Sequence, residues 1–382
     1  MKIEIDTKEL LKGLKEIKKT VAKTTDTLYN QTKGFVKISS HKQKGLTIES
    51  TDSTGQIKYI FDPDLYTVDS FESFGVEPKM LEKILKTFKG TPTTLNFDKE
   101  KGMLEAINGT SNFKIETFKG ELIYYDSKNP TSEFTISTDD FIRVFGSVVE
   151  SISKLEARPI LTSVHLWSDN SNTIRVVATD SHRLTMNSFD TPTKINEKIN
   201  LNLNGSMIEK IIKDKRSLSG DLTVTLFDNY AKISSDKKEY FVEFVQGAYP
   251  DTDRLIPTDS DTTLTVDENE ITPKIASAKI VAENRIDYAV LLTIDDSKAL
   301  VHANSDDTSD LDLSYSSELK SMHNGDELTI AFNPDYMLSA LKNLKESSIT
   351  LDFTGALRPF TIKTDKDDRL VELVTPIRIF EY

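Results

Sequence analysis

The sequence is built from three related units, and this repetition limits the possible folds more than any other feature. The segment Met80–Lys86 aligns with Met207–Lys213 and with Tyr336–Lys342. The last lysines of these segments stand about 128 residues apart along the chain. A weak repeat of this length predicts three domains of similar structure, arranged as a ring or an array.

Each unit has the same order of predicted elements. First comes a strand end, then an Asp, Ser or Thr and acidic residues, which suit the positive N-terminus of a helix. These helix starts are Ile5–Leu10, Ile136–Phe141 and Val266–Ile271. After the second helix of each unit, apolar and polar residues alternate as they do in half-buried strands. These segments are Thr94–Phe97, Leu222–Phe227 and Ile349–Phe353.

These elements predict an α+β fold of three structurally repeated domains, each with two helices packed on a mostly antiparallel sheet. The length of 382 residues suits three domains of common size better than one core. The predicted domains are 1–128, 129–257 and 258–382, with polar linkers at 126–131 and 253–261. The six predicted helices cover 8–23, 77–89, 138–154, 206–216, 268–285 and 335–345.

Several function classes are disfavoured by what the sequence lacks. It has no run of about 18 apolar residues, no signal-peptide core and no cysteine, so we expect a soluble, cytoplasmic protein that enters no membrane. The glycine-rich nucleotide-binding strings and the Gly-x-Ser-x-Gly motif are absent. The five histidines are too far apart for a metal motif, and the adjacent Asp180, Ser181 and His182 do not make a triad, which requires convergence in space. We therefore expect no enzyme activity, no cofactor and no metal.

The charge is unevenly distributed. The whole chain has a formal net charge of −13, which disfavours a nucleic-acid-binding protein. The six predicted helices together carry net positive charge, however, so the acidic surplus lies elsewhere. A basic helical layer on an acidic body attracts a polyanion to one surface. The alternative is that these lysines only solvate exposed helix faces, as lysines usually do.

Four segments together resemble a known family. Val176–Leu184 contains the string Ala-Thr-Asp-Ser-His-Arg-Leu, with Ala157–Thr162 before it and Gly247–Asp251 after it. With the closing segment Leu373–Ile379, they resemble the bacterial sliding clamp family, the β subunit of DNA polymerase III, over essentially the whole chain. The resemblance implies a head-to-tail homodimeric ring of six similar domains, in which helices line a central hole.

The resemblance also implies a non-catalytic function in DNA replication. The implied protein is a processivity factor that encircles double-stranded DNA without reading its sequence. The implied partners are the DNA polymerase III catalytic subunit, the clamp loader, other proteins with a clamp-binding motif, and a second copy of the chain. The alternative is a scaffold built on the same repeats that binds proteins without encircling DNA, and this alternative would show no preference for closed circular DNA.

Basic residues on the predicted helices are the candidates for contact with DNA, because screened attraction to phosphates holds a duplex without stopping it from sliding. The resemblance adds Arg158, although Pro159 and Ile160 stand where some relatives carry aromatic residues. The candidates are Lys12, Lys15, Lys19, Lys23, Lys83, Lys86, Arg143, Arg158, Lys210, Lys213, Lys279 and Lys342.

A peptide-docking pocket between the second and third domains is the other implied site. Its residue types suit a short peptide, because Leu, Pro and Ile supply an apolar floor and the polar residues supply hydrogen bonds at the rim. Read without the resemblance, His182 is a half-buried histidine in a turn. Thr375 is smaller than the usual family residue, and Phe380–Tyr382 extend the usual ending. The predicted lining is Leu161, Thr179, His182, Arg183, Leu184, Pro250, Arg254, Leu255, Asn333, Tyr336, Leu357, Pro359, Val374, Thr375, Pro376, Ile377 and Arg378.

Overall fold

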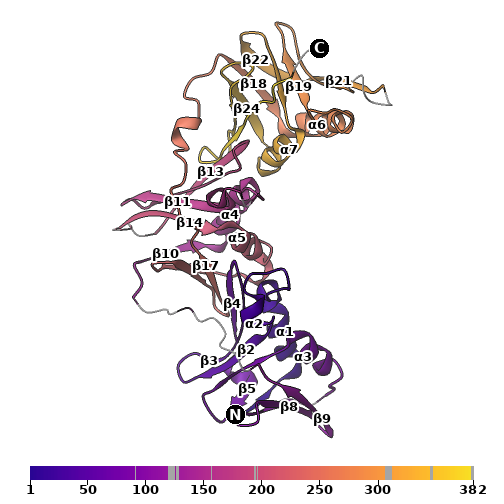
Figure 1. The fold of residues 1–382 in the computed structure, drawn as a ribbon. Coiled ribbons are helices and arrows are strands. Elements are labelled where there is room, and N and C mark those ends of the chain that lie inside the picture. The colour runs from indigo at the N-terminus through magenta and orange to yellow at the C-terminus, as the bar shows by residue number, and fades with distance from the viewer. Residues whose placement is uncertain are drawn as a thin grey trace. The chain divides into compact units, whose positions relative to one another are not determined.

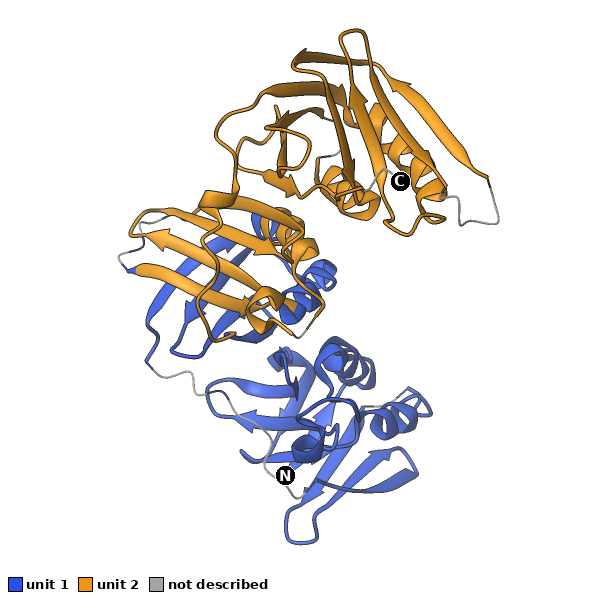
Figure 2. Ribbon diagram, turned by 45° about the horizontal axis from the view of Figure 1, so that its top comes forward, with its two compact units in different colours: residues 1–141, 191–197, 206–244 blue, residues 142–190, 198–205, 245–382 orange. Residues whose placement is uncertain are grey.

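A computed structural model describes residues 1–90, 92–118, 125, 129–155, 157–192, 195, 197–305, 312–344 and 347–379. The predicted extension Phe380–Tyr382 and part of the first predicted linker lie outside these residues. The chain forms two compact units (Figure 2). Unit 1 contains residues 1–141, 191–197 and 206–244, and unit 2 contains residues 142–190, 198–205 and 245–382. Among the described helices, none is long and apolar enough to cross a membrane.

The helices begin where the sequence predicts. Asp6 accepts hydrogen bonds from the amides of Lys8 and Glu9, and Asp267 caps the sixth helix in the same way, which confirms two of the predicted helix starts. Glu77 and Asn333 cap two others. The helices are α1 Thr7–Ile17, α2 Tyr29–Thr32, α3 Pro78–Leu85, α4 Thr138–Val148, α5 Gly205–Ile212, α6 Glu268–Ala282 and α7 Pro334–Asn343.

Unit 1 contains two antiparallel sheets (Figure 1). The five-stranded sheet has the order β5-β1-β7-β8-β9, and the eight-stranded sheet has the order β10-β15-β16-β17-β4-β3-β2-β6. Helix α1 packs against α3 and against β3 and β4. The strands are β1 Lys2–Ile5, β2 Val36–His41, β3 Gly45–Asp52, β4 Gly55–Ile60, β5 Tyr66–Val68, β6 Ser73–Val76, β7 Thr93–Asp98, β8 Met103–Asn108, β9 Ser111–Glu116, β10 Ser132–Ser137, β15 Asp221–Leu226, β16 Tyr230–Ser234 and β17 Lys238–Glu243.

Unit 2 also contains two antiparallel sheets. The nine-stranded sheet has the order β14-β11-β12-β13-β26-β25-β24-β18-β22, and the four-stranded sheet has the order β21-β20-β19-β23. Helix α6 packs against α7, β20 and β21. The strands are β11 Ser163–Asp169, β12 Thr173–Thr179, β13 Arg183–Asp190, β14 Lys198–Asn204, β18 Thr262–Asp267, β19 Val290–Ile294, β20 Ala299–Asn304, β21 Ser314–Leu319, β22 Ser321–Gly325, β23 Leu328–Phe332, β24 Ser348–Phe353, β25 Phe360–Thr364 and β26 Val371–Val374.

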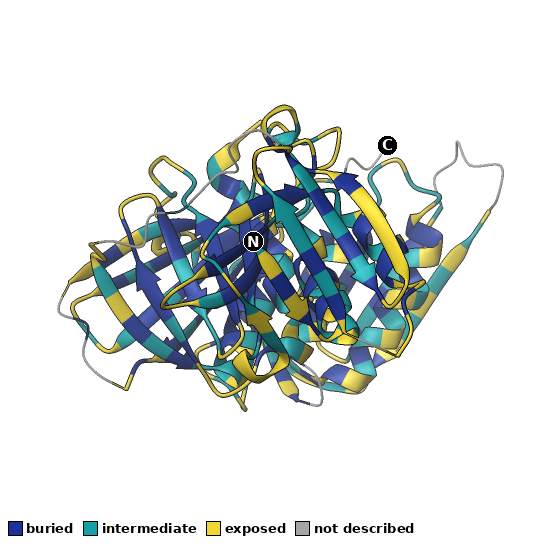
Figure 3. Ribbon diagram, turned by 90° about the horizontal axis from the view of Figure 1, so that it is seen from below, coloured by how far each residue is buried: buried dark blue, intermediate teal, exposed yellow. Residues whose placement is uncertain are grey.

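The alternation seen in the sequence matches burial along the strands (Figure 3). In β8, Leu104, Ala106 and Asn108 are buried while the residues between them are partly exposed, and β18 shows the same pattern. The helices cover the apolar sides of the sheets, so the core of each repeat lies between helix and sheet. This arrangement agrees with the predicted α+β class.

Two strand pairs join one repeat to the next, and we name them the first and second junctions. At the first junction, β17 of the second repeat pairs with β4 of the first repeat. At the second junction, β26 of the third repeat pairs with β13 of the second repeat. The first junction requires Gly55, because a Cβ on this residue, whose φ is +151°, would stand 2.1 Å from the carbonyl oxygen of Phe241.

The junctions explain why the compact units differ from the predicted domains. Because each sheet continues through a junction, each half of the central repeat is grouped with its neighbour, and the division into units passes through that repeat. The division into domains at 1–128, 129–257 and 258–382 rests on the repeat and stays a prediction.

Candidate functional site

The site begins at the turn between β12 and β13, next to the second junction. The Asp180 carboxylate accepts hydrogen bonds from the amides of His182 and Arg183 at 2.9 and 3.0 Å. Ser181 takes a left-handed φ of 80°. The Arg183 guanidinium also donates to Asp180 at 3.1 Å. The short carboxylate side chain therefore fixes the turn and the direction of the arginine together.

Tyr336 packs beside this turn. Its ring lies 5.0 Å from the guanidinium carbon of Arg183 and 6.1 Å from the ring of His182, with an angle of 13° between the two rings. Asn333 caps α7 and so fixes the start of the helix that carries Tyr336. Burial raises the pKa of Tyr336, so its hydroxyl remains protonated at neutral pH. The structure thus brings four predicted residues into one cluster.

The end of β26 closes the cluster. The amide and the hydroxyl of Thr375 both donate to the carbonyl oxygen of His182, at 2.9 and 2.8 Å. The amide of Ile377 donates to the carbonyl oxygen of Ala331 at 2.7 Å. The smaller Thr375 therefore has a structural function at this position, because its hydroxyl holds the chain end against the turn.

An apolar floor lies on the sheet face next to the cluster. Val177, Leu184 and Leu373 form a buried group against which Tyr249 and Ile256 pack. The hydroxyl of Tyr249 accepts a hydrogen bond from the amide of Thr179 at 3.1 Å. Sequence reasoning missed Val177, Leu373 and Tyr249. The signal for Leu373 is its position opposite Leu184 in the strand register, which only the fold reveals.

The remaining predicted pocket residues differ in exposure. Leu255 and Leu357 are large apolar side chains that are 47% and 64% exposed. Arg254 pairs with Asp251 at 2.8 Å. Buried residues are Leu161 and Val374; partly buried residues are Pro359, Pro376 and Ile377; exposed residues are Pro250 and Arg378. We call the surface formed by Leu184, Leu373, Tyr249, Tyr336 and Thr375 the groove.

The predicted DNA-contacting residues fall into two groups. Lys15, Lys23 and Lys83 are exposed and form no ion pair within the described part of the chain. Arg158 donates to the hydroxyl of Ser181 at 3.5 Å. Each of the others forms an ion pair with a carboxylate. The pairs are Lys12 with Glu9, Lys86 with Glu82, Arg143 with Asp367, Lys213 with Glu209, Lys279 with Asp335, Lys342 with Glu150, Lys19 with Asp214, and Lys210 with Asp52.

Two of these lysines belong to an ionic network at the first junction. Lys19 donates to Asp214 at 2.8 Å, and Lys210 donates to Asp52 and to Thr54 at 2.5 and 2.7 Å. Lys19 and Lys210 are only partly exposed, so their contacts stabilise the chain itself. The exposed lysines are the better candidates for a polyanion.

The centre of this network is Lys238, which sequence reasoning missed. Its side chain is 2% exposed and contacts both Glu16 and Asp214. The hydroxyl of Tyr240 also donates to Asp214, at 2.8 Å. Burial opposes the charge on Asp214, but hydrogen bonds from Lys19 and Lys238 outweigh it and lower the pKa of this carboxyl.

The second junction holds a buried acid that has no paired cation among the residues described by the structure. Glu372 accepts hydrogen bonds from the amide of Asn343 at 2.7 Å and from the hydroxyl of Thr185 at 2.6 Å. Complete burial raises the pKa of Glu372 to about 8. The carboxyl is therefore mostly protonated at neutral pH.

Two family models match the chain. The model described as DNA polymerase III beta subunit, central domain, matches residues 135–251. The model described as DNA polymerase III beta subunit, C-terminal domain, matches residues 253–378.

Relatives with similar sequences are named beta sliding clamp. The chain is 27% identical to that of Bacillus subtilis over 391 aligned positions, which cover 100% of both chains. It is 30% identical to that of Streptococcus pneumoniae serotype 4 over 246 positions, which cover 62% of each chain. The match to the S. pneumoniae relative therefore spans less than two thirds of that protein's length.

Solved structures share the fold. The DNA polymerase sliding clamp from Bacillus subtilis has a TM-score of 0.88 at 24% identity, with 100% of both chains covered. The DNA polymerase III beta chain from Streptococcus pneumoniae also has a TM-score of 0.88, at 22% identity, with 99% of this chain and 100% of the other covered. These likenesses confirm the predicted fold class.

Proposed function

The chain belongs to the bacterial DNA polymerase III β-subunit family, and from this membership we propose that it is a DNA sliding clamp. In this function it encircles duplex DNA in the cytoplasm, is put in place by the clamp loader, and tethers the replicative polymerase and other proteins through a docked peptide. The subunit is non-catalytic, so its contribution to replication is to keep the polymerase on the template.

One observation carries this proposal. Both junctions use equivalent strand pairs, and the two strands that would form a third equivalent pair have no partner on their outer edges within the described chain. At each junction the last strand of one repeat pairs with a strand of the preceding repeat, β17 with β4 and β26 with β13. The strand equivalent to β17 and β26 in the first repeat is β9, and the strand equivalent to β4 and β13 in the third repeat is β21. Both are edge strands of their sheets. A second copy satisfies both edges, and a head-to-tail dimer with twofold symmetry forms both contacts together.

The registers inside the repeats identify the equivalent residues on β9. A row across the sheet starts two residues before the last buried apolar residue of the strand ahead of each first helix, which is Ile5, Ile136 or Val266, and ends on the edge strand or junction strand. The rows are Ile3–Leu95–Ala106–Phe113, Phe134–Val224–Ile233–Tyr240 and Leu264–Leu351–Ile362–Glu372. Phe113 is thus the equivalent of Tyr240 and Glu372.

The same reasoning applies to β21. The rows of the other sheet are Ile38–Ile48–Tyr59, Leu166–Val176–Asn187 and Leu292–Val301–Ser317. Tyr315 therefore corresponds to Ile57 and Thr185, which stand opposite Tyr240 and Glu372 at the junctions. Between two copies, we expect Phe113 opposite Tyr315 and Ile115 opposite Leu313, an apolar contact with an aromatic pair. Phe113 is 39% exposed in the single chain, as an unfilled interface residue should be.

The exposed lysines supply the attraction to DNA. Lys15 and Lys83 stand on α1 and α3, and Lys23 lies three residues after the 3₁₀ turn Lys18–Thr20; all three lack a carboxylate partner within the described ranges. Exposed, unpaired lysines bind phosphates through screened charge without base contacts, and this permits sliding. The acidic remainder of the chain repels DNA from other surfaces.

The groove supplies the docking of partner peptides. Leu184 and Leu373 give an apolar floor, while Arg183, His182 and Tyr336 give donors and a stacked wall. This combination suits a short extended peptide with one or two apolar anchors and a glutamine. Polymerases and other proteins that carry such a motif then compete for it.

The test combines mass in solution with retention on DNA. Sedimentation should give a dimer, and the protein, once loaded, should stay on a closed circular plasmid and leave after the plasmid is cut once. A monomer, or equal retention on circular and linear DNA, would contradict the proposal and favour a scaffold that binds proteins without encircling DNA.

A further inference from the structure

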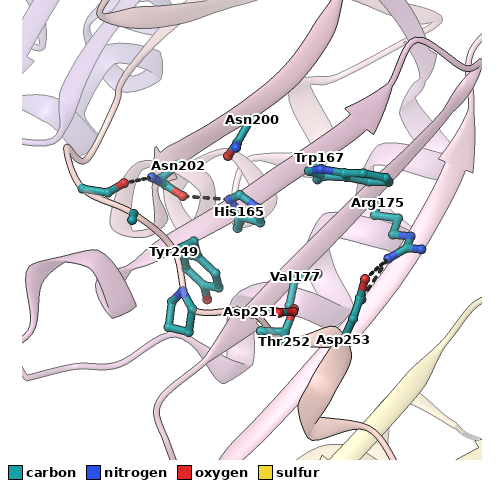
Figure 4. Close-up of a pocket in the computed structure, with 13 residues that line it drawn as sticks. His165, Trp167, Arg175, Val177, Asn200, Asn202, Tyr249, Asp251, Thr252 and Asp253 are labelled. Atoms are coloured by element: carbon teal, nitrogen blue, oxygen red, sulfur yellow. Dashed lines mark hydrogen bonds and ion pairs between the residues drawn. The ribbon is translucent and has the colours of Figure 1, made fainter. Parts of the chain in front are cut away.

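A cavity of about 550 Å³ lies on the sheet face of unit 2 next to the groove (Figure 4). Strands β11, β12 and β14 form its base, and residues 247–253 cross over it. Val177 and Tyr249 line this cavity and also belong to the apolar group of the groove. The two surfaces are therefore continuous, and a bound peptide can extend from one into the other.

Trp167 and Arg175 form the far end of the cavity. They stand opposite each other in the register of β11 and β12, and the guanidinium carbon lies 4.9 Å from the centre of the indole ring. Asp253 accepts both of its hydrogen bonds, at 2.9 Å each, from the same guanidinium nitrogen, Nη1. Among the described residues, Nε and Nη2 of Arg175 have no partner, so one edge of the guanidinium keeps its donors unused.

The other end of the cavity is held rigidly. The ring of His165 stacks on Tyr249 with 4.6 Å between centres and an angle of 4°. Asn202 donates its amide hydrogens to the carbonyl oxygens of Val245 and Gly247, so its oxygen accepts from Nδ1 of His165 at 2.8 Å. Burial lowers the pKa of His165, so the ring is neutral at pH 7. The cavity wall is thus preformed.

We propose that this cavity is a second subsite for the same partner peptides and that it recognises an acidic side chain flanking the motif. This inference rests on the proposed docking function of the groove. The carboxylate of the peptide binds the free edge of Arg175, and the carbon chain of the same side chain lies against Trp167. A guanidinium edge and a carboxylate match in geometry, and stacking on the indole holds the guanidinium in place.

The contact between Arg175 and Asp253 does not prevent this binding. Their side chains are 40% and 63% exposed, and an exposed pair of this kind contributes little to stability because water screens it. Asp251, the other carboxylate at the cavity, is already paired with Arg254. The cavity offers one guanidinium edge with unused donors, which suits a single carboxylate and not the repeated phosphates of a nucleic acid, so a peptide is the favoured ligand.

The length of the flanking segment follows from the strand. Arg175 lies four residues before Thr179 on β12, which is about 13 Å at the rise of a strand. A peptide anchored in the groove therefore needs roughly four more residues to place a carboxylate on Arg175. The probes are a minimal peptide with a glutamine and two apolar anchors, and peptides with four added residues at either end that finish in Glu or in Gln.

Trp167 makes the experiment direct because it is the only tryptophan of the chain. We expect one Glu-ended peptide to bind about three- to tenfold more tightly than its Gln-ended match and to change the emission of Trp167. Arg175→Gln should abolish this gain without weakening the minimal peptide. Arg369→Gln is the matched control. Arg369 is similarly exposed and pairs with Asp190 at a distance of 2.7 Å, and neither residue lines the cavity.

If the minimal peptide binds but the Glu- and Gln-ended peptides have equal affinity and leave the emission of Trp167 unchanged, the inference is overturned. Failure of the minimal peptide to bind at all would instead overturn the docking function of the groove, and the inference with it. Trp167→Leu, followed by anisotropy of a labelled peptide, should reduce the gain from Glu. A gain that persists in Trp167→Leu and in Arg175→Gln would place the carboxylate elsewhere.

Discussion

At the first junction a strand tyrosine meets a carboxylate at a helix end, whereas at the second junction a strand carboxyl meets an amide at a helix end. Tyr240 and Glu372 occupy equivalent rows, and Asp214 and Asn343 each follow the aligned lysine of the second helix. The hydrogen bonds are 2.8 and 2.7 Å long. The two junctions therefore share the hydrogen bond but not the charges. The carboxyl group belongs to the helix end at the first junction and to the strand at the second, where no counterpart of Lys19 and Lys238 contacts it among the described residues.

The two junctions also differ on the opposite sheet face. At the first junction, Phe241 stacks with Tyr125 at 5.2 Å, and the hydroxyl of Tyr125 donates to Glu243 at 2.7 Å. At the second junction the equivalent Leu373 joins Leu184 in the floor of the groove. The comparison shows how one architecture produces a face filled by its own aromatic residues at the first junction and the face that we propose for docking at the second.

The largest expected effect comes from removing the cation that distinguishes the first junction. Lys238→Met leaves the partly buried Glu16 and Asp214 without their shared partner, which should lower the free energy of unfolding by about 3–5 kcal/mol. Urea denaturation measures this loss. Lys237→Met is the matched control, because its exposed pair with Asp62 should contribute about 0–1 kcal/mol. A loss below about 1 kcal/mol for Lys238→Met would contradict this account of the junction.

The second junction should respond to pH. The pKa of Glu372 is about 8 in the folded chain and near the ordinary 4.5 in the unfolded chain. Folding thus favours the protonated form, and this stabilisation is complete below pH 4.5 and is lost as the pH rises towards 8. Relative to Glu372→Gln, the wild type should lose on the order of 2–4 kcal/mol of unfolding free energy across that range. If the unfolding free energies of the two proteins changed with pH in the same way, the raised pKa of Glu372 would be contradicted.

The third pairing, between copies, should be weakened by removing its aromatic pair. Phe113→Ala combined with Tyr315→Ala should cost about 2–4 kcal/mol of dimer stability, because the contact occurs twice in a twofold dimer. Sedimentation at several concentrations measures the change in Kd. Phe71→Ala serves as the control, since this exposed phenylalanine belongs to neither edge strand. A double variant that dimerises like the wild type would show that the register of the junctions does not extend to the dimer.

The groove should lose affinity without loss of the dimer. Leu184→Ala combined with Tyr336→Ala should cost about 1–3 kcal/mol of peptide binding, through lost apolar contact and a lost stacked wall. Titration of a polymerase-derived peptide against both proteins measures this change. Equal affinities would reject the groove, and a loss of dimerisation would show that these residues act elsewhere.

The smallest effect on stability is expected at the exposed lysines. Changing Lys15, Lys23 and Lys83 to Gln should alter the unfolding free energy by less than about 0.5 kcal/mol each, in contrast to Lys238. Each substitution should also reduce the salt dependence of DNA retention by about one unit of slope. Lys99→Gln, in an exposed turn between β7 and β8, should leave the slope unchanged. An unchanged slope for all three lysines would remove them from the DNA surface.

The helix starts were predictable from local chemistry. Asp6, Ser137 and Asp267 are capping residues whose effect depends only on the next few residues. The helix ends were not: the first predicted helix reaches Lys23, but α1 ends at Ile17 and continues as a 3₁₀ turn over Lys18–Thr20. The side chain of Ser50, distant in the sequence, bonds the carbonyl oxygen of Ile17 at 2.5 Å, and no local signal reveals this contact.

The functional residues divide in the same way. His182, Arg183, Leu184 and Tyr336 were identified by the family motif, and the structure brings them to one surface. Glu372 and Lys238 occur in alternating strands, where a charged residue normally indicates an exposed side. Their burial depends on strands that meet across repeats, so their function at the junctions could not be predicted from spacing alone.

The pairing of β17 with β4 has a consequence for how the chain is made. The two strands are about 180 residues apart, so at a synthesis rate of 5–20 residues per second β4 leaves the ribosome roughly 10–40 s before its partner exists. During that interval the first repeat presents an unpaired strand edge, which invites pairing with other nascent chains. Lys58, near the middle of β4 and paired with Glu49 of β3 at 3.3 Å, places a charged side chain on this edge that discourages such pairing, and Glu239 of the arriving strand joins it at 3.5 Å. The ion pair of the finished sheet is thus also a safeguard for the nascent one.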